Sequence, residues 1–201
     1  SNKAIKYRLY PNDEQKVMFA KTLGCCRFVY DQLLALQKQR YKDGESHLSK
    51  CKSNEYATRT LKKDYDFLKE IDKFAVSNAV FHLADAYDRF FKKQNHFPKF
   101  KSKRKSKKSY TTNFTNNNIL IGKNVIKLPK VGMVKAVIHK LPKDDWKLKS
   151  VTVSQDGVGN YFASVLFEYE QEDIPSVSKS STNAIGLDYK SDGLYMDSNG
   201  N

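Results

Sequence analysis

The hydrophobic period changes twice along the chain, and this change constrains the fold more than any other feature. Residues 3–10 (KAIKYRLY) alternate, with Ile5, Tyr7 and Leu9 on one side, which predicts a strand with one apolar face. From residue 12 to about residue 93 the apolar residues recur with helical spacing. After the basic run that ends at residue 108, the sequence is again typical of strands. A single first strand followed by helices and further strands predicts an α+β fold with a helical bundle inserted after that strand.

Three helices are predicted in the middle stretch. The first begins after Asn12, with Gln15 at the capping-box spacing, and ends near Lys42. The second spans roughly residues 54–69, and the third runs from about Lys73 to Lys93. The apolar stripes that we expect in the bundle core are Phe19, Leu23, Cys26, Tyr30 and Leu33; Ala57, Leu61, Tyr65 and Leu68; and Val76, Val80, Leu83, Tyr87 and Phe90.

The stretch after the basic run holds several short β-like segments separated by turns rich in Asn and Gly, which predicts a small barrel or sandwich. The last of these segments places Tyr161, Ala163, Val165, Phe167 and Tyr169 on one face. Residues 171–183 are rich in Ser and Thr and read as a linker, so a new unit is expected from Ala184.

An anionic partner is expected because Lys and Arg number 36 against 22 for Asp and Glu, giving a net charge of +14. Nucleic acid is favoured over a membrane surface, because the basic run has no amphipathic face and no apolar run is long enough to span a bilayer. Nearby Phe97, Phe100 and Tyr110 could stack on bases or could pin this loop to the bundle. The seven cations of the run are Lys99, Lys101, Lys103, Arg104, Lys105, Lys107 and Lys108.

The remaining composition points to a cytoplasmic protein with reduced thiols. The three cysteines, Cys25, Cys26 and Cys51, form no CxxC pair, and the four histidines are scattered. Near the end, "AIGLDYKSDGLYMDSNGN" places Asp188 after an apolar run. From the residues alone, Asp188 is either a turn residue that closes a small hairpin or the first ligand of a metal site.

Several long sequence segments resemble the N-terminal part of the TnpB family of transposon-encoded, RNA-guided DNA nucleases, which are related to compact type V CRISPR effectors. They include "KAIKYRLYPNDEQ", "TLGCCRFVYDQLLA", "FPKFKSKRKSKKSYTTNFTNNNI" and "AIGLDYKSDGLYMDSNG". The resemblance implies an OB-like β-barrel wedge domain (residues 1–11 and 96–170) with an inserted three-helix recognition domain (residues 12–95). It also implies a linker (residues 171–183) and the first hairpin of a RuvC domain with an RNase H-like fold (residues 184–201).

The resemblance makes Asp188, in the word Gly186-Leu187-Asp188, the first catalytic carboxylate and a Mg²⁺ ligand of the complete RuvC site. Hard carboxylate oxygens suit the two Mg²⁺ ions of such nucleases. The other acidic ligands and the family's zinc-binding cysteines belong to later parts of RuvC, so neither metal is expected on these 201 residues. Lys190 stands where many family members have Gly.

Target-motif recognition is carried over to Lys73, Phe74 and Ser77 at the start of the third predicted helix, to Thr115, and more loosely to Asn54. Lys73 and Ser77 lie four residues apart, so one helical face presents both. The alternatives are that Phe74 is a core residue and Lys73 a plain first-turn surface residue. The three asparagines of residues 116–118 are either polar contacts or turn formers.

The implied function is the guide-RNA and target-DNA binding half of a transposon-associated endonuclease. Its partners would be a guide RNA from the transposon end and double-stranded DNA with a short adjacent motif, bound by a monomer near the bacterial nucleoid. The parent protein would hydrolyse DNA phosphodiesters with two metals, whereas the 201-residue chain alone would be inactive. The alternatives are a nuclease-inactive guided repressor and a plain helix-turn-helix binder of transposon DNA.

Overall fold

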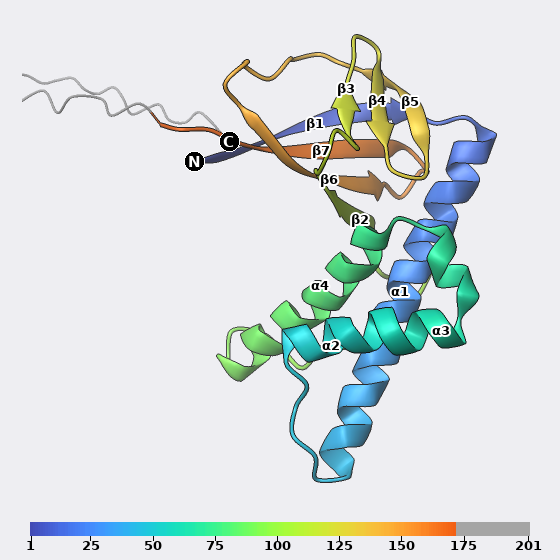
Figure 1. The fold of residues 1–201 in the computed structure, drawn as a ribbon, viewed down its shortest axis with the longest axis vertical. Coiled ribbons are helices and arrows are strands. Elements are labelled where there is room, and N and C mark those ends of the chain that lie inside the picture. Colours follow the sequence, from blue (N-terminus) through green and yellow to red (C-terminus); the bar gives the residue numbers. More distant parts are fainter. Residues whose placement is uncertain (172–201) are drawn as a thin grey trace, which may run out of the picture. The chain divides into compact units, whose positions relative to one another are not determined.

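A computed structural model describes residues 1–171, and it confirms the α+β class (Figure 1). Ser1–Tyr169 form one unit. The predicted linker and RuvC hairpin, including Asp188, lie outside the described residues, except for Gln171. The helical elements are α1 (Asp13–Lys42), α2 (Lys50–Tyr56), the π-helix η1 (Ala57–Leu61), α3 (Lys62–Asp64), the 3₁₀ helix η2 (Asp66–Glu70) and α4 (Lys73–Phe91). The strands are β1 (Asn2–Tyr10), β2 (Lys108–Asn113), β3 (Leu120–Ile121), β4 (Val125–Leu128), β5 (Gly132–Val137), β6 (Lys147–Gln155) and β7 (Tyr161–Glu168).

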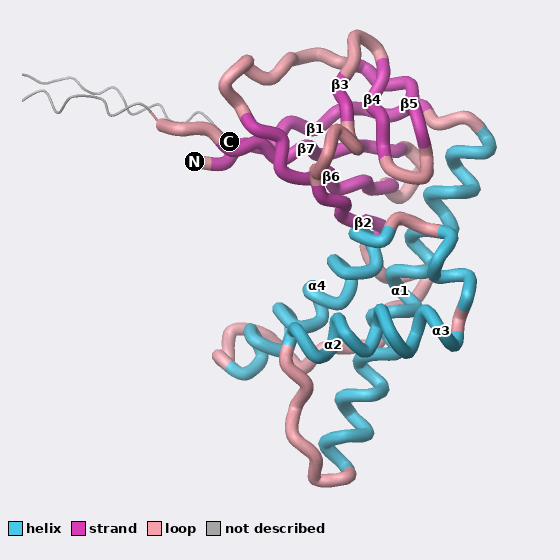
Figure 2. Tube along the Cα trace, viewed as in Figure 1, coloured by secondary structure: helices cyan, strands magenta, loops and turns pink. Residues whose placement is uncertain are grey.

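The strands form one antiparallel sheet in the order β2-β6-β7-β1-β5-β4-β3, so the first strand of the sequence lies near the middle (Figure 2). In the register, Arg8 pairs with Phe162 of β7 on one side and Val137 of β5 on the other. Between residues 1 and 171 no ladder joins the edge strands β2 and β3. The pairing therefore gives a seven-stranded sheet, and the OB-like barrel stays a prediction.

The sheet core and the first helix follow the predicted patterns. Ile5, Tyr7 and Leu9 are all buried on the inner face of β1. Both capping-box bonds exist at α1: the Gln15 amide donates to Asn12 Oδ1 (2.8 Å), and the Asn12 amide donates to Gln15 Oε1 (3.0 Å). Phe19 of α1 is fully buried and stacks on Tyr161 of β7, with ring centroids 5.2 Å apart. This contact joins the helices to the sheet.

The second predicted helix was partly wrong. The helix begins earlier, after the N-cap Ser49, and ends at Asp64 rather than near residue 69. In η1 the Lys62 amide donates to the carbonyl of Ala57, five residues back, so this turn is wider than an α-turn. The wide turn shifts the apolar stripe, and Tyr65 leaves the helix (φ −129°, ψ 87°) instead of filling the core. Its ring packs on Phe28 instead, at a centroid distance of 4.8 Å.

Helix α4 agrees with the third predicted helix and contacts both α1 and β2 (Figure 1). Its apolar stripe is buried at Val76, Val80, Leu83 and Tyr87. The side-chain amide of Asn78 donates to the Thr111 carbonyl and to Asn113 Oδ1, both at 2.8 Å, and so ties α4 to β2. Among residues 1–171 there is no helix with the length and hydropathy that a membrane span requires.

Candidate nucleic-acid interface

The N-terminus of α4 is built around the buried carboxylate of Asp72. Asp72 is 4% exposed, and its Oδ1 accepts a hydrogen bond from the Phe74 amide (3.0 Å) as the N-cap of the helix. Burial raises the pKa of the Asp72 carboxyl, although the Phe74 amide, Lys73 and Lys130 act against the rise. The second oxygen of Asp72, Oδ2, has no hydrogen-bond partner. A buried, incompletely paired acid thus lies beneath a surface of lysines.

These lysines line an open hollow of about 470 Å³, which we call the lysine hollow. Three of the predicted target-motif residues, Lys73, Phe74 and Thr115, meet there, and the Lys73 Nζ lies 5.3 Å from the centroid of the Phe74 ring. Phe74 is half-buried and Lys73 exposed, so Phe74 is not a fully buried core residue. The other lining residues are Lys62, Lys69, Ile71, Asp72, Asn116, Asn118, Pro129 and Lys130.

Two other predicted contact residues do not line the lysine hollow. Ser77 is half-buried one turn along α4, and Asn54 is half-buried on α2 with its Oδ1 unpaired. Conversely, sequence reasoning missed Lys62, Lys69 and Lys130. Lys130 has a positive φ of 66° in the β4–β5 turn, and the Pro129-Lys130 pair between two apolar runs was the signal that could have pointed to this turn.

The three asparagines after Thr115 form a turn. Asn116 and Asn117 have positive φ angles of 47° and 55°, a conformation that asparagine tolerates well. Asn118 Oδ1 accepts a hydrogen bond from the Thr115 amide (2.8 Å), and its Nδ2 donates to the Asn113 carbonyl (2.9 Å). The turn-forming alternative therefore describes them, and this turn holds Thr115 at the rim of the lysine hollow.

The basic loop, residues 99–108, has no helix or strand before β2 begins at Lys108, but hydrogen bonds hold it in place. Ser102 and Ser106 close a turn in which the Ser102 amide donates to Ser106 Oγ (2.9 Å). The Lys101 amide donates to Asp31 Oδ1 (2.7 Å), and the Lys101 Nζ lies 4.4 Å from the centroid of the Tyr30 ring. Burial lowers the pKa of Lys101. The other six cations of this loop are exposed: Lys99, Lys103, Arg104, Lys105, Lys107 and Lys108.

Of the aromatic residues around the basic loop, Tyr110 is buried, whereas Phe97 is 40% exposed and Phe100 is 51% exposed. Phe97 lies 5.5 Å from Tyr87 and 5.1 Å from Phe90, ring centroid to ring centroid, and Lys38 lies over Phe97 and Phe100. Tyr110 is 3% exposed and packs on Phe19, so its ring is not open to a base. The structure therefore gives Tyr110 a packing role, in place of the nucleic-acid contact predicted for it.

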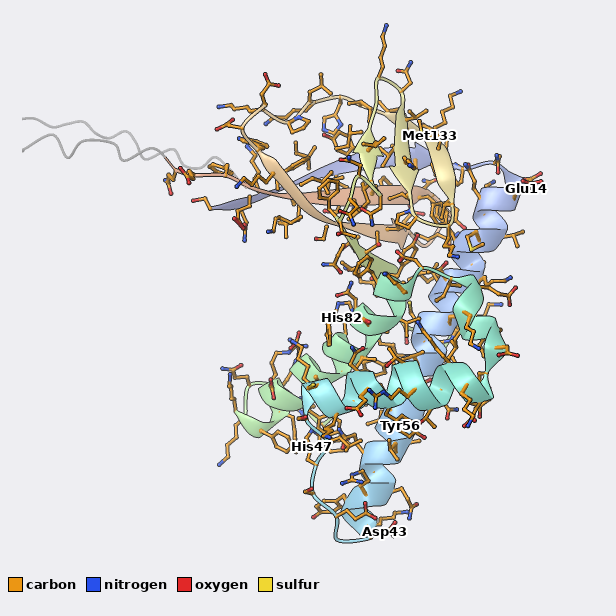
Figure 3. All side chains as sticks on the ribbon, viewed as in Figure 1. Glu14, Asp43, His47, Tyr56, His82 and Met133 are labelled. Atoms are coloured by element: carbon orange, nitrogen blue, oxygen red, sulfur yellow. The ribbon has the colours of Figure 1, made fainter. Side chains whose placement is uncertain are left out.

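Beneath the basic loop a cavity of about 30 Å³, partly open to solvent, lies between α1, α4, β2 and the loop. His82, labelled on α4 in Figure 3, lines it together with Arg27 and Lys101. Burial and the Lys101 ammonium lower the pKa of His82. Within residues 1–171 no cluster of three or more His, Cys, Asp or Glu side chains has the arrangement of a metal site.

An α+β unit that exposes a lysine hollow and a lysine-rich loop has the surface of a nucleic-acid-binding protein. A family model described as a helix-turn-helix domain (HTH_OrfB_IS605) matches residues 1–46. A protein of Streptomyces pristinaespiralis named "Putative RNA-guided DNA endonuclease" is 29% identical over 188 residues, which cover 92% of this chain and 45% of that protein. The InsQ protein of Escherichia coli K12, which carries the same description, is 27% identical over 92% of this chain and 44% of its own length.

A third relative, the virulence protein VsdF of Salmonella dublin, is 32% identical over 111 residues, which are 50% of this chain and 93% of that protein. The chain belongs to the TnpB family. It spans less than half the length of the two relatives named as endonucleases. Residues 1–46 contain β1 and α1 in the structure, and so one helix rather than the two of a helix-turn-helix.

Proposed function

We propose that this chain is the guide-RNA and target-DNA binding part of a transposon-associated, RNA-guided DNA endonuclease. The observation that carries the proposal is the lysine hollow, where α4 and the turn after β2 bring Lys73, Phe74 and Thr115 together with three further lysines. The names of the two longest-matching relatives support the same activity. Lysines supply the attraction to phosphate, while the half-buried Phe74 and the Thr115 hydroxyl offer contacts to base edges.

In this proposal the lysine hollow reads a short motif on duplex DNA, and base pairing with the guide reads the rest. Lys73 and Thr115 contact the DNA directly, and Ser77 and Asn54, which do not line the lysine hollow, are further contacts outside it. The basic loop follows the phosphate backbone of the guide or the target through its six exposed cations. The sheet acts as an OB-like wedge domain (residues 1–11 and 96–170), the helices as the recognition domain (residues 12–95), and the protein works as a monomer.

We place catalysis in the RuvC portion, with Asp188 as its first Mg²⁺ ligand, after the proposed linker of residues 171–183. Two Mg²⁺ ions in such a site activate a water molecule and stabilise the leaving oxygen. The 201-residue chain then binds nucleic acid and does not cut it.

The proposal is tested by binding and cleavage assays on the same preparations. The purified 201-residue chain is expected to bind guide RNA and to leave DNA intact with Mg²⁺ present. In the full-length nuclease, Asp188→Ala is expected to abolish cleavage and to leave guide binding near wild type. Mg²⁺-dependent cutting by the 201-residue chain would refute the proposal, and a collapse of guide binding in the Asp188→Ala protein would make Asp188 structural.

A further inference from the structure

The outward faces of β1, β5 and β7 carry an aromatic and cationic surface that the proposed function does not use. The inward positions of these strands are filled by core residues such as Tyr7, Val134 and Val165. The side chains at the outward positions therefore do not pack in the core. We call this surface the outer sheet face, and its residues are Lys6, Arg8, Tyr10, Lys135, Val137 and Phe162.

Arg8 lies at the centre of the outer sheet face. The register places Phe162 directly beside it on β7 and Val137 directly beside it on β5. The guanidinium carbon of Arg8 lies 4.6 Å from the centroid of the Tyr10 ring and 5.5 Å from that of Phe162. Lys6 Nζ lies 4.6 Å from the same Phe162 ring. Cations and aromatic rings thus alternate across neighbouring strands.

The orientation of Arg8 is fixed by the β6–β7 turn. Its Nη2 donates a hydrogen bond of 2.8 Å to Asn160 Oδ1. Asn160 is held in turn by Asp156, whose Oδ1 accepts from the Asn160 amide (2.8 Å) and from the Val158 amide (3.1 Å). These backbone hydrogen bonds lower the pKa of the Asp156 carboxyl. A planar cation held in one orientation beside two rings is preorganised for stacking.

The outer sheet face is exposed at Lys6, Tyr10, Lys135 and Val137 and half-buried at Arg8 and Phe162, and its charged residues are all cations. Tyr10 is 48% exposed and Val137 is 49% exposed. Lys6, Arg8 and Lys135 supply three positive charges, and Lys135 pairs with Tyr10 in the register. The outward residues of β7 beside them, Ser164 and Leu166, are uncharged. A polyanion with planar groups complements this combination better than an apolar protein segment does, because exposed lysines are depleted at protein–protein contacts.

We propose that the outer sheet face binds single-stranded nucleic acid by stacking unpaired bases on Tyr10, Phe162 and the plane of Arg8, while Lys6 and Lys135 contact the phosphates. The inference rests on the proposed function, because it assigns an unpaired segment of the bound nucleic acid to a second surface. Aromatic rings and arginine planes on a sheet accept any base, so this surface holds a strand without reading its sequence.

The test compares the 201-residue chain with its Tyr10→Leu, Phe162→Leu variant for binding to unpaired RNA and DNA oligomers of mixed sequence. Leucine keeps an apolar side chain but cannot stack. The double variant is expected to lose about 5-fold in affinity if one of the two rings stacks on a base. If both rings stack on bases, the expected loss is about 25-fold. Tyr41→Leu is the matched control, because Tyr41 is 85% exposed and belongs to the last turn of α1. Figure 3 shows Asp43, which follows α1, far from Met133 of β5.

An abasic oligomer of the same length separates stacking from charge. Its affinity is expected to be the same for the wild type and the double variant, because the phosphate contacts remain. A loss of affinity by the double variant would support the stacking surface. A loss for RNA alone would identify RNA as the ligand, and a loss for both RNA and DNA would show that the surface accepts either strand. Unchanged affinity for base-containing strands, in a wild type that does bind RNA, would overturn this inference and leave the proposed function standing. A wild type that binds no RNA at all would overturn both.

Cross-linking of the unaltered chain covers the case in which the double variant unfolds. With 4-thiouridine in the RNA strand, the expected adducts lie on peptides that contain Tyr10 or Phe162. Adducts confined to the basic loop or to α4 would overturn the inference without any substitution.

Discussion

The basic loop and the lysine hollow are both positively charged, but they are assembled in opposite ways. The loop gathers seven cations within ten consecutive residues, and one of them, Lys101, is turned inward against Tyr30 and Asp31. The hollow gathers four lysines from four separate segments (α3, η2, α4 and the β4–β5 turn) around the buried Asp72. The loop is thus mainly a concentration of charge, whereas the hollow has a defined shape.

This difference predicts two kinds of binding. Exposed lysines on a loop contribute an attraction that depends on salt and is indifferent to sequence. A hollow that holds an aromatic ring and a hydroxyl in fixed positions can discriminate between sequences. Substitutions in the two regions should therefore change different quantities: the salt dependence of binding for the basic loop, and sequence discrimination for the lysine hollow.

The largest effect is expected from replacing Lys103, Arg104 and Lys105 of the basic loop by alanine. If all three meet phosphates of duplex DNA, the slope of log K against log salt falls by about 2.7, since each contact adds about 0.9. Affinity at about 0.1 M salt then falls roughly 100-fold or more. Fluorescence anisotropy across a salt series measures both quantities.

The matched control for the loop variant removes three exposed lysines elsewhere, at Lys16, Lys42 and Lys123. It changes the net charge by the same amount. An equal loss of slope in the control would show that the total charge matters and the basic loop does not.

A smaller but more specific effect is expected in the lysine hollow from Lys73→Ala combined with Phe74→Leu. Discrimination between a duplex that carries the target motif and one that lacks it should fall by about 5- to 150-fold, the range of one to three kcal/mol for a good base contact. The salt slope should fall by only about 0.9, because a single cation is lost. Competition binding with the two duplexes measures the ratio.

Lys92→Ala, at the other end of α4, is the control for a lost lysine on the same helix. If discrimination survives in the Lys73, Phe74 variant but falls in the loop variant, the roles assigned to the two regions are reversed.

Asn78→Ala tests whether the lysine hollow depends on the seam between α4 and β2. The substitution leaves the Thr111 carbonyl and Asn113 Oδ1 without their shared donor. It should lower the free energy of unfolding by about 1–3 kcal/mol and weaken sequence discrimination, while the salt slope stays unchanged. Urea unfolding and competition binding measure the two outcomes. Asn95→Ala, at an exposed position outside the helices, should change neither.

What could be predicted from the sequence follows the same division between local and assembled features. The Asn12–Gln15 capping box, the apolar face of β1 and the extent of α4 depend on residues a few positions apart, so their spacing reveals them. Lys73, Phe74 and Thr115 were found through the family resemblance, and the structure places them together. Their role in binding stays a prediction.

The missed features depend on long-range packing. Lys62, Lys69 and Lys130 share no spacing, and they meet only because α3, η2 and the β4–β5 turn converge. Tyr110 follows the basic run directly, so a contact to nucleic acid was predicted for it beside the alternative that it pins the loop to the bundle. It alternates with Thr112 on the inner side of β2, and this alternation was the available sign that its ring points into the core.

The smallest effect, on stability alone, is expected from Asp72→Asn. Asparagine caps a helix as well as aspartate does, so the N-cap bond to Phe74 survives. The pKa of Asp72 is raised in the folded state, so between the ordinary value of 3.8 and the raised value the folded protein binds more protons than the unfolded one. Wild-type stability therefore declines as pH rises through this window, and the Asn variant escapes the decline. It should unfold at a higher temperature than the wild type at neutral pH, with a smaller difference at acid pH.

Asp156→Asn is the control with the opposite sign. Backbone hydrogen bonds lower the pKa of Asp156, so its carboxylate stabilises the fold above pH 3.8, and this contribution disappears as pH falls through the lowered value. This variant should lose stability at neutral pH. If Asp72→Asn is also less stable than the wild type at neutral pH, the cost of burying the Asp72 carboxylate is smaller than the stabilisation it receives from neighbouring charges and hydrogen bonds. If the Asp72→Asn variant is more stable but discriminates less between duplexes, the buried carboxylate destabilises the fold and helps binding. In that case its charge holds Lys73 and Lys130 in place in the lysine hollow.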